Sequence, residues 1–114
     1  MKRVLITGIT GYIGSHLARQ LLTDCEVYGL VREPLHTEYI LEFQDRLHLE
    51  TTDGDYTSIE AAMRKIQPDI VYHLATYYTG GHGPEATPAL IASNITFSAY
   101  LLEAMSTCGC SALV

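Results

Sequence analysis

The sequence predicts an α/β fold in which helices cover both faces of a mainly parallel sheet. Short apolar runs alternate with amphipathic segments along the whole chain, and three closely spaced glycines separate the first run from the first amphipathic segment. Strands that are joined by helical crossovers pair in parallel. Because such crossovers are right-handed, the expected architecture is a doubly wound sheet with the strand order 3-2-1-4-5.

The first strand and helix of this sheet are predicted at the N-terminus. Residues 3–7 form a β-branched apolar run, which is typical of a buried strand. Ile13, Leu17 and Leu21 then recur at every fourth position. This spacing predicts one apolar stripe on a helix that covers residues 12 to about 24.

The second and third strands are expected over residues 27–31 and 47–51. Residues 34–46 lie between them and begin with a proline, and their scattered apolar side chains are compatible with either a short helix or an ordered loop. Thr57 and Glu60 have the spacing of a capping box, which predicts that a helix begins there.

The helix that follows the capping box is expected to turn Ile59, Met63 and Ile66 inward and to end before Pro68. A fourth strand is predicted over residues 70–74. Residues 1–74 are therefore expected to contribute four strands to the sheet.

The last third of the sequence contains a loop, a long helix and the start of a strand. Residues 76–88 are rich in glycine, proline and polar side chains, which predicts a surface loop. The helix is expected to run from residue 85 or 89 to about 107 and to stop at Gly109. Residues 111–114 resemble the first half of a fifth strand. The predicted apolar side of the long helix consists of Ile91, Ile95, Leu102 and Met105.

Composition and charge exclude several classes of protein. The 114 residues suffice for one domain, and 47% hydrophobic against 18% charged residues excludes a disordered chain. The net charge of −6 and the presence of only two lysines, Lys2 and Lys65, argue against a nucleic-acid partner. No apolar run reaches the roughly 18 residues of a membrane span, so no membrane partner and a cytoplasmic location are expected.

No metal site is expected either. None of the five histidines, His16, His36, His48, His73 and His82, has metal-ligand spacing with another residue. Cys108 and Cys110 are separated by one residue, unlike a CxxC pair. His73 is expected to have a structural hydrogen-bonding role, and His82 to be a solvated loop histidine.

The glycines at positions 8, 11 and 14 are the most informative residues. Gly8 permits a tight turn away from the strand, Gly11 lets a pyrophosphate approach the backbone, and Gly14 lets the helix lie close to the sheet. The amides and the positive dipole end of the helix N-terminus attract a pyrophosphate. A tight strand–helix turn without a ligand is the alternative, and the placement between an apolar strand and an apolar-striped helix favours the ligand.

Four motifs resemble those of the extended short-chain dehydrogenases/reductases, which include nucleotide-sugar epimerases, dehydratases and reductases. The motifs are TGITGYIGSHL at residues 7–17, GDY at 54–56, DIVYHLA at 69–75, and Asn94 followed by LLEA at 101–104. The resemblance implies that residues 1–114 form a Rossmann dinucleotide-binding domain, incomplete at strand 5 and without its substrate domain. Residues 72–76 and 93–97 are most similar to reductases of the CDP-abequose-synthase type.

The resemblance also implies a set of cofactor contacts. The phosphate turn is expected to contribute contacts from Gly8, Thr10, Gly11, Tyr12, Ile13 and Gly14. Asp55 is expected to accept a hydrogen bond from the adenine amino group, with help from the Tyr56 backbone. Leu74 and Ala75 are expected beside the nicotinamide ribose, and Asn94 on the long helix behind the cofactor.

The end of the second predicted strand bears on the choice of cofactor. Arg32 stands where family members that prefer NAD carry an aspartate, and an arginine there can pair with the 2′-phosphate of NADP. Glu33 can instead bind the ribose diol and favour NAD. We therefore expect NADP as the cofactor, with NAD as the alternative.

No catalytic residue is predicted in this chain. The family uses a Ser or Thr with a YxxxK pair, and none of the eight tyrosines has a lysine four positions later. The chain is expected to be the cofactor-binding part of a nucleotide-sugar oxidoreductase or epimerase that transfers hydride at a sugar carbon, either as a fragment or as a short natural form. An inactive dinucleotide-binding module for sensing or assembly is the alternative. Homodimerisation through the helix at 88–107 is expected by resemblance.

Overall fold

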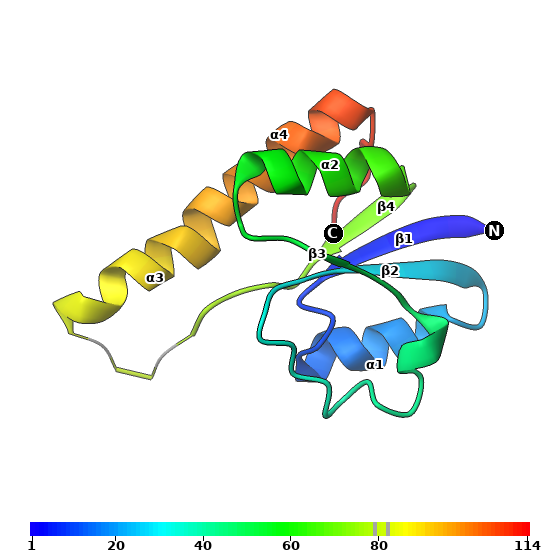
Figure 1. The fold of residues 1–114 in the computed structure, drawn as a ribbon, viewed down its shortest axis with the longest axis horizontal. Helices are drawn as coiled ribbons and strands as arrows, with labels where there is room; N and C mark the ends of the chain where they lie inside the picture. The colour runs from blue at the N-terminus through cyan, green and yellow to red at the C-terminus, as the bar shows by residue number, and fades with distance from the viewer. Residues whose placement is uncertain (79, 82) are drawn as a thin grey trace.

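A parallel β-sheet forms the centre of the molecule (Figure 1). The structure is a computed structural model that describes residues 1–78, 80–81 and 83–114. Within these residues the sheet has four strands in the order β3-β2-β1-β4, all parallel, which confirms the predicted arrangement of strands 1 to 4. The strands are β1 (Lys2–Thr7), β2 (Cys25–Val31), β3 (His48–Thr51) and β4 (Ile70–His73).

The C-terminal residues lie beside the outer edge of β4. Leu113 forms a parallel bridge with Val71, and the Val71 N–H donates to the carbonyl oxygen of Ala112 at 2.9 Å. The Val114 N–H donates back to the Val71 carbonyl at 2.8 Å. This pairing matches the predicted start of a fifth strand next to strand 4.

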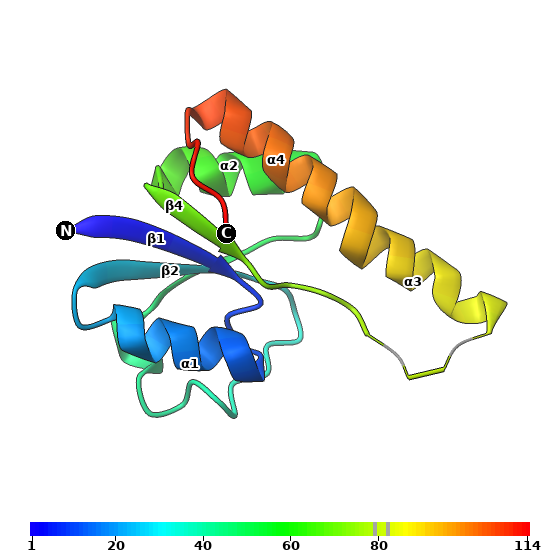
Figure 2. The ribbon, with the colours of Figure 1, turned by 180° about the vertical axis from the view of Figure 1, so that it is seen from behind.

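Helices cover both faces of the sheet, as Figures 1 and 2 show from opposite sides. Helices α2 (Tyr56–Ile66) and α4 (Phe97–Cys108) lie together on one face. Helix α1 (Tyr12–Leu21) covers the other face, together with the connection that contains the 3-10 turn η1 (Gln44–Arg46). The chain therefore has the predicted doubly wound, Rossmann-type fold.

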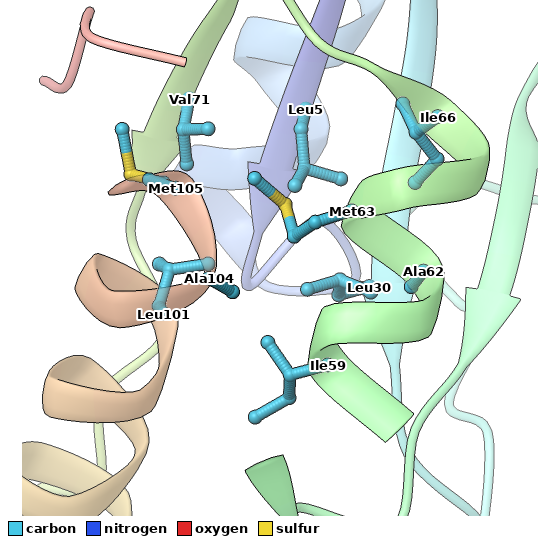
Figure 3. Close-up of a cluster of buried hydrophobic side chains, with 10 residues drawn as sticks. All are labelled: Leu5, Leu30, Ile59, Ala62, Met63, Ile66, Val71, Leu101, Ala104 and Met105. Atoms are coloured by element: carbon cyan, nitrogen blue, oxygen red, sulfur yellow. The ribbon is translucent and has the colours of Figure 1, made fainter. Parts of the chain in front are cut away.

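The core between the sheet and helices α2 and α4 is apolar throughout (Figure 3). The strands contribute three residues, α2 contributes four and α4 contributes three. Burial of large aliphatic side chains stabilises a fold by about 1.5–3 kcal/mol each. These residues are Leu5, Leu30 and Val71 from the strands, Ile59, Ala62, Met63 and Ile66 from α2, and Leu101, Ala104 and Met105 from α4.

A second core lies under α1 and includes the connection from β2 to β3. Ile40 is fully buried and Phe43 is 5% exposed, and both pack with the sheet residues Val4, Ile6 and Val27. Apart from η1, this connection has no regular structure. Residues 34–46 are thus an ordered loop, which resolves the two alternatives that the sequence left open.

The predicted apolar stripe of α1 is partly wrong. Ile13 is 71% exposed, whereas Gly14, Ser15 and Ala18 face the sheet. The helix also ends at Leu21 and not near residue 24. Because a glycine and other small residues line the inner face, the helix approaches the sheet closely and leaves Ile13 outside.

The start of α2 differs from the capping-box prediction. The helix begins at Tyr56 with Asp55 at its N-cap, so Thr57 lies inside the first turn. The Ser58 hydroxyl bonds instead to Asp53 Oδ1 and to the Asp55 carbonyl. The inward residues of α2 were predicted correctly.

The last predicted helix is divided, and of the four residues predicted on its apolar side only Met105, which is 4% exposed, is buried. A 3-10 turn, η2 (Pro84–Ala86), leads into α3 (Thr87–Ile91), and a π-helical turn, η3 (Ala92–Thr96), joins α3 to α4. The exposed fractions of Ile91, Ile95 and Leu102 are 46%, 63% and 51%.

Two features of the structure explain this error. Helix α3 projects past the end of the sheet, so its apolar residues find no neighbour to cover them (Figures 1 and 2). The π turn also adds a residue to one helical turn, which shifts the residues after it relative to those before it. As a result α4 packs through Leu101, Ala104 and Met105.

Candidate cofactor-binding site

The carboxyl ends of β1, β2 and β4 surround three adjoining hollows. In doubly wound sheets, ligands bind at this end, where the strand order reverses. The turn hollow lies over the glycine turn, the central hollow lies between the ends of β2 and β4, and the outer hollow lies beside the end of β3. Their linings include Gly8, Thr10, Gly11, Tyr12, Ile13, Gly14, Leu74 and Ala75 for the turn hollow, Gly8, Thr10, Arg32, Glu33, His36, Thr52, Ala75, Thr76, Ser93 and Phe97 for the central hollow, and Arg32, Glu33, Thr51, Thr52, Asp53 and Ser58 for the outer hollow.

The glycine turn is built as the sequence predicts. Gly8 has a φ of +74°, which side chains rarely tolerate, and its carbonyl accepts the Gly11 N–H at 3.0 Å. A Cβ on Gly8 would lie 2.8 Å from the backbone nitrogen of Ala75. A Cβ on Gly14 would collide with the Gly8 carbonyl. Two of the three glycines are therefore required by close backbone contacts.

The first turn of α1 leaves backbone donors at the turn hollow. Gly11 is the N-cap and carries no side chain to cap the helix, and no acidic residue lies in the first turn. The first amides of an α-helix have no intrahelical acceptor and attract anions. Tyr12, Ile13 and Gly14 supply these amides, and all three line the turn hollow.

A hydrogen-bonded network ties β1, β4 and α4 together behind these hollows. The Thr7 hydroxyl oxygen lies 3.1 Å from the backbone nitrogens of both Leu74 and Ala75, and 2.6 Å from Nδ1 of His73. His73 Nε2 lies 2.8 Å from the Ser98 hydroxyl oxygen. Burial lowers the pKa of His73 below its ordinary value, which favours the neutral imidazole.

Arg32 follows directly after β2 and reaches toward the β3 side of the site. Its guanidinium lies over Gly54, where a Cβ would be 3.4 Å from the central guanidinium carbon. Arg32 and Glu33 both line the central and outer hollows. Arg32, which favours NADP, and Glu33, which favours NAD, therefore border the same space.

Asp53 is a site residue that sequence reasoning missed. Its carboxylate accepts the Asp55 N–H and the Ser58 hydroxyl, each at 2.8 Å. The Asp55 N–H and then the Ser58 hydroxyl hold the pKa of Asp53 below its ordinary value, and the Arg32 charge adds to them. Asp53 lines the outer hollow, while Asp55 occupies the N-cap position of α2 without a capping hydrogen bond from its side chain. The Asp-Gly pair at 53–54, with Gly54 at a φ of +92°, was the available signal.

Asn94 lies in the π turn and fastens the segment that follows β4. Its Oδ1 accepts the Thr76 hydroxyl and the Tyr77 N–H, both at 2.9 Å, and its Nδ2 donates to the Tyr77 carbonyl at 3.0 Å. Thr76 lines two of the hollows, so Asn94 shapes them through its neighbour. π turns are frequent at functional sites because they redirect side chains.

The structure brings together most of the predicted site residues but not all of them. The residues of the glycine turn, Arg32, Leu74 and Ala75 line the hollows, whereas Asp55, Tyr56 and Asn94 line none of the three. The central hollow is also lined by Thr76, Ser93 and Phe97, which the sequence analysis did not assign to the cofactor site. His82 lies outside the described residues.

Neither a metal site nor a membrane span is found in the described part of the chain. No group of three or more histidine, cysteine, aspartate or glutamate side chains is placed to hold a metal ion among residues 1–78, 80–81 and 83–114. In the same residues no helix has the length and apolar character needed to cross a bilayer.

A parallel sheet whose first strand opens through a glycine turn onto a helix N-terminus defines the dinucleotide-binding class of α/β proteins. The sequence pattern of one family, described as the NAD dependent epimerase/dehydratase family, matches residues 4–114. This match covers nearly the whole chain, and the chain belongs to that family.

Solved structures of similar proteins agree with this assignment. The UDP-glucose 4-epimerase of Thermus thermophilus, in complex with NAD, is 28% identical with a TM-score of 0.85 over 97% of this chain. The UDP-glucose-4-epimerase of Stenotrophomonas maltophila, with bound NAD and formylated UDP-arabinopyranose, is 28% identical with a TM-score of 0.84 over 99% of this chain. The enzyme WbmH of Bordetella bronchiseptica, in complex with NAD+, is 26% identical with a TM-score of 0.83 over 99%. The chain spans 36%, 36% and 38% of these three structures.

Proposed function

We propose that this chain binds a nicotinamide dinucleotide and is the cofactor-binding part of a nucleotide-sugar oxidoreductase or epimerase. The observation that carries the proposal is the open first turn of α1, because its amides face the turn hollow and no side chain caps them. The close approach of Ala75 to Gly8 adds a backbone wall to the same hollow. A diphosphate between these two walls would receive several N–H donors at once.

The two ends of the dinucleotide are assigned to different hollows. The adenosine end fits the outer hollow, where Arg32 and Asp53 supply a cation and an acceptor. Asp55 and the Tyr56 backbone at the adjacent start of α2 are the family's adenine contacts by resemblance. The nicotinamide end is directed toward Leu74 and Ala75 in the turn hollow.

The finer assignment of NADP rests on Arg32. Its guanidinium borders both the central and the outer hollow, and a fork of N–H donors matches a phosphate better than a ribose hydroxyl. NAD is the competing cofactor, and it is favoured by Glu33 in the same lining and by the NAD in the similar structures. Parallel titrations with NADPH and NADH, followed by fluorescence, separate the two. Tighter binding of NADH would end the NADP assignment.

The proposed reaction is hydride transfer at a sugar carbon of a nucleotide sugar. The bound nicotinamide supplies the hydride acceptor or donor, and the residues of this chain bind and orient it. The sequence contains no YxxxK pair, so we expect no turnover by these 114 residues alone. The alternative function, an inactive module for sensing or assembly, is also expected to bind the dinucleotide. Turnover of a sugar nucleotide by the protein as its native gene encodes it would favour the oxidoreductase or epimerase, and dinucleotide binding without turnover would favour the inactive module.

The proposed substrate class is a nucleotide sugar. By resemblance, the proposed subtype of enzyme is a reductase of the CDP-abequose-synthase type. Residues 72–76 and 93–97 carry that resemblance. In the structure Thr76, Ser93 and Phe97 line the central hollow, so these segments border the candidate site. Reduction of a CDP-4-keto sugar supports the subtype, whereas epimerisation of UDP-glucose without that reduction contradicts it.

A homodimer through α3 and α4 is proposed as the assembly. Ile91, Ile95 and Leu102 are exposed apolar side chains of α3, η3 and α4. A second copy would cover such side chains by packing helix against helix, which is how the resemblance implies that such proteins assemble.

A further inference from the structure

The Thr7 hydroxyl has its hydrogen-bonding capacity filled by three partners. A hydroxyl has one proton to donate and two lone pairs that accept. The N–H groups of Leu74 and Ala75 can only donate, and both reach the Thr7 oxygen at 3.1 Å. The remaining partner, His73 Nδ1 at 2.6 Å, must therefore receive the Thr7 proton.

This arrangement determines the tautomer of His73. Because Nδ1 accepts, the proton of the neutral ring lies on Nε2. Nε2–H then donates to the Ser98 hydroxyl at 2.8 Å, and Ser98 donates onward to the Asn94 carbonyl at 3.2 Å. Every donor in this chain finds an acceptor, and the direction of each bond follows from the Thr7 hydroxyl. In the opposite tautomer Nδ1–H would be a third donor to the Thr7 oxygen, which has only two lone pairs, and the Thr7 proton would have no acceptor.

The network holds a stretch of backbone that borders the candidate site. The Ala75 N–H is fastened to β1 through the Thr7 hydroxyl, whereas the Leu74 N–H is shared between that hydroxyl and the Thr7 carbonyl, at 3.2 Å. Ala75 also touches Gly8 so closely that no Cβ fits between them. Ala75 lines both the turn hollow and the central hollow. A small displacement of this peptide would change the wall against which a dinucleotide packs.

We propose that His73 is a positioning residue of the cofactor site, which as its Nε2–H tautomer orients the Thr7 hydroxyl and so holds the Leu74–Ala75 amides against Gly8. This inference rests on the proposed dinucleotide function. His73 does not line any of the three hollows, so its action is exerted through Thr7 and the two amides. The groups that face its ring are the Thr7 and Ser98 hydroxyls and the Phe97 ring, whose centroid is 5.6 Å away.

The first test is spectroscopic and uses the protein without cofactor. Two-bond ¹⁵N–¹H correlations of the histidines, assigned with His73→Asn, report which ring nitrogen carries the proton. We expect a neutral His73 with the proton on Nε2 at pH 7.5. A proton on Nδ1, or a charged ring at this pH, would overturn the proposal.

The second test compares two substitutions that each preserve one half of the imidazole. The side-chain oxygen of His73→Asn reaches the place of Nδ1 and keeps the acceptor for Thr7, whereas the amide of His73→Gln reaches the place of Nε2 and loses that acceptor. We expect His73→Gln to weaken NADH or NADPH binding about tenfold, because it leaves the Thr7 hydroxyl misdirected. His73→Asn should stay within about threefold of the wild type for the same reason.

AMP is the control ligand, because it carries only the adenosine end. The outer hollow does not include Leu74 or Ala75, so AMP binding should be unchanged in both variants. Equal losses for AMP and dinucleotide, or no loss in His73→Gln, would overturn the positioning role while the proposed function stands. If the wild-type protein binds neither ligand, the proposed function fails together with this inference. Unfolding curves confirm that every variant is folded at the temperature of the titrations.

Discussion

Gly14 lies directly against the carbonyl of Gly8, so that helix α1 meets the glycine turn without space for a side chain. The contact joins the first turn of the helix to the end of β1. It keeps the helix amides in a defined place relative to the hollows that border the turn.

Gly14→Ala should destabilise the fold. The new methyl group would collide with backbone atoms that cannot rotate away, and overpacking of this kind costs about 1–3 kcal/mol. Chemical denaturation measures the free energy of unfolding. Gly80→Ala is the matched control, because a Cβ there would meet only the Tyr78 hydroxyl, at 3.8 Å. Equal stability of the two variants would contradict the close contact.

Gly11→Val should abolish dinucleotide binding and cost less stability than Gly14→Ala. Gly11 has an extended backbone that valine tolerates, and an added Cβ would lie 3.3 Å from the Gly8 carbonyl oxygen, a tight contact but a looser one than at Gly14. The branched side chain would instead occupy the space in front of the helix amides. Isothermal titration with NADPH and NADH is the measurement, with the exposed substitution Ala61→Val as a control. Unchanged affinity in Gly11→Val would remove the main support for the phosphate-binding turn.

Arg32→Ala should weaken NADPH binding selectively. A charge-assisted hydrogen bond contributes about 1.5–3 kcal/mol, so the loss for NADPH should be about 10- to 100-fold with little change for NADH. Arg46→Ala serves as a control, because Arg46 is exposed in the η1 turn and lines none of the three hollows. Equal effects on the two cofactors would show that Arg32 does not select the 2′-phosphate.

Stability should fall as the solution is acidified through the range in which His73 titrates. The folded state holds the pKa of His73 below the ordinary value of 6.5 by burial, so the unfolded chain binds the proton more readily. The contribution is fully present above pH 6.5 and is lost as the pH falls toward the folded-state pKa. Denaturation at pH 7.5 and 5.5 measures the change in the free energy of unfolding between these pH values. Subtracting the same change measured for His73→Asn separates the contribution of His73 from those of the other histidines. Identical changes in the two proteins would contradict the burial effect.

Ile95→Glu should shift the protein toward the monomer. Ile95 is 63% exposed and lies between Ile91 and Leu102 in the chain, and a charge there opposes the burial of these apolar side chains against a second copy. Sedimentation velocity measures the oligomeric state, with Ala61→Glu on exposed α2 surface as the charge-matched control. A wild-type protein that is monomeric at the same concentrations would contradict the proposed dimer.

The sequence determined the layout of this protein because its signals are local and periodic. A β-branched apolar run such as residues 4–7, which Gly8 follows at once, favours a buried strand, and the glycine spacing favours a tight strand–helix turn; the structure has both. The helix stripe of Ile59, Met63 and Ile66 has the period of an α-helix, and all three residues are buried as expected. The signals for these elements lie within a few positions of one another in the chain, although the contact of Gly8 with Ala75 is formed by the fold.

The tertiary structure alone decided which of several possible faces and partners each residue uses. Ile91 and Ile95 have an apolar pattern like that of a buried helix, but α3 extends past the sheet and a π turn changes the phase before α4. Asp53 lines the outer hollow with Arg32 because β3 pairs with β2. His73 reaches Thr7 because β1 and β4, whose paired residues are 66 positions apart, lie side by side. Hydrogen bonds of this kind require exact distances and directions that a one-dimensional pattern does not contain.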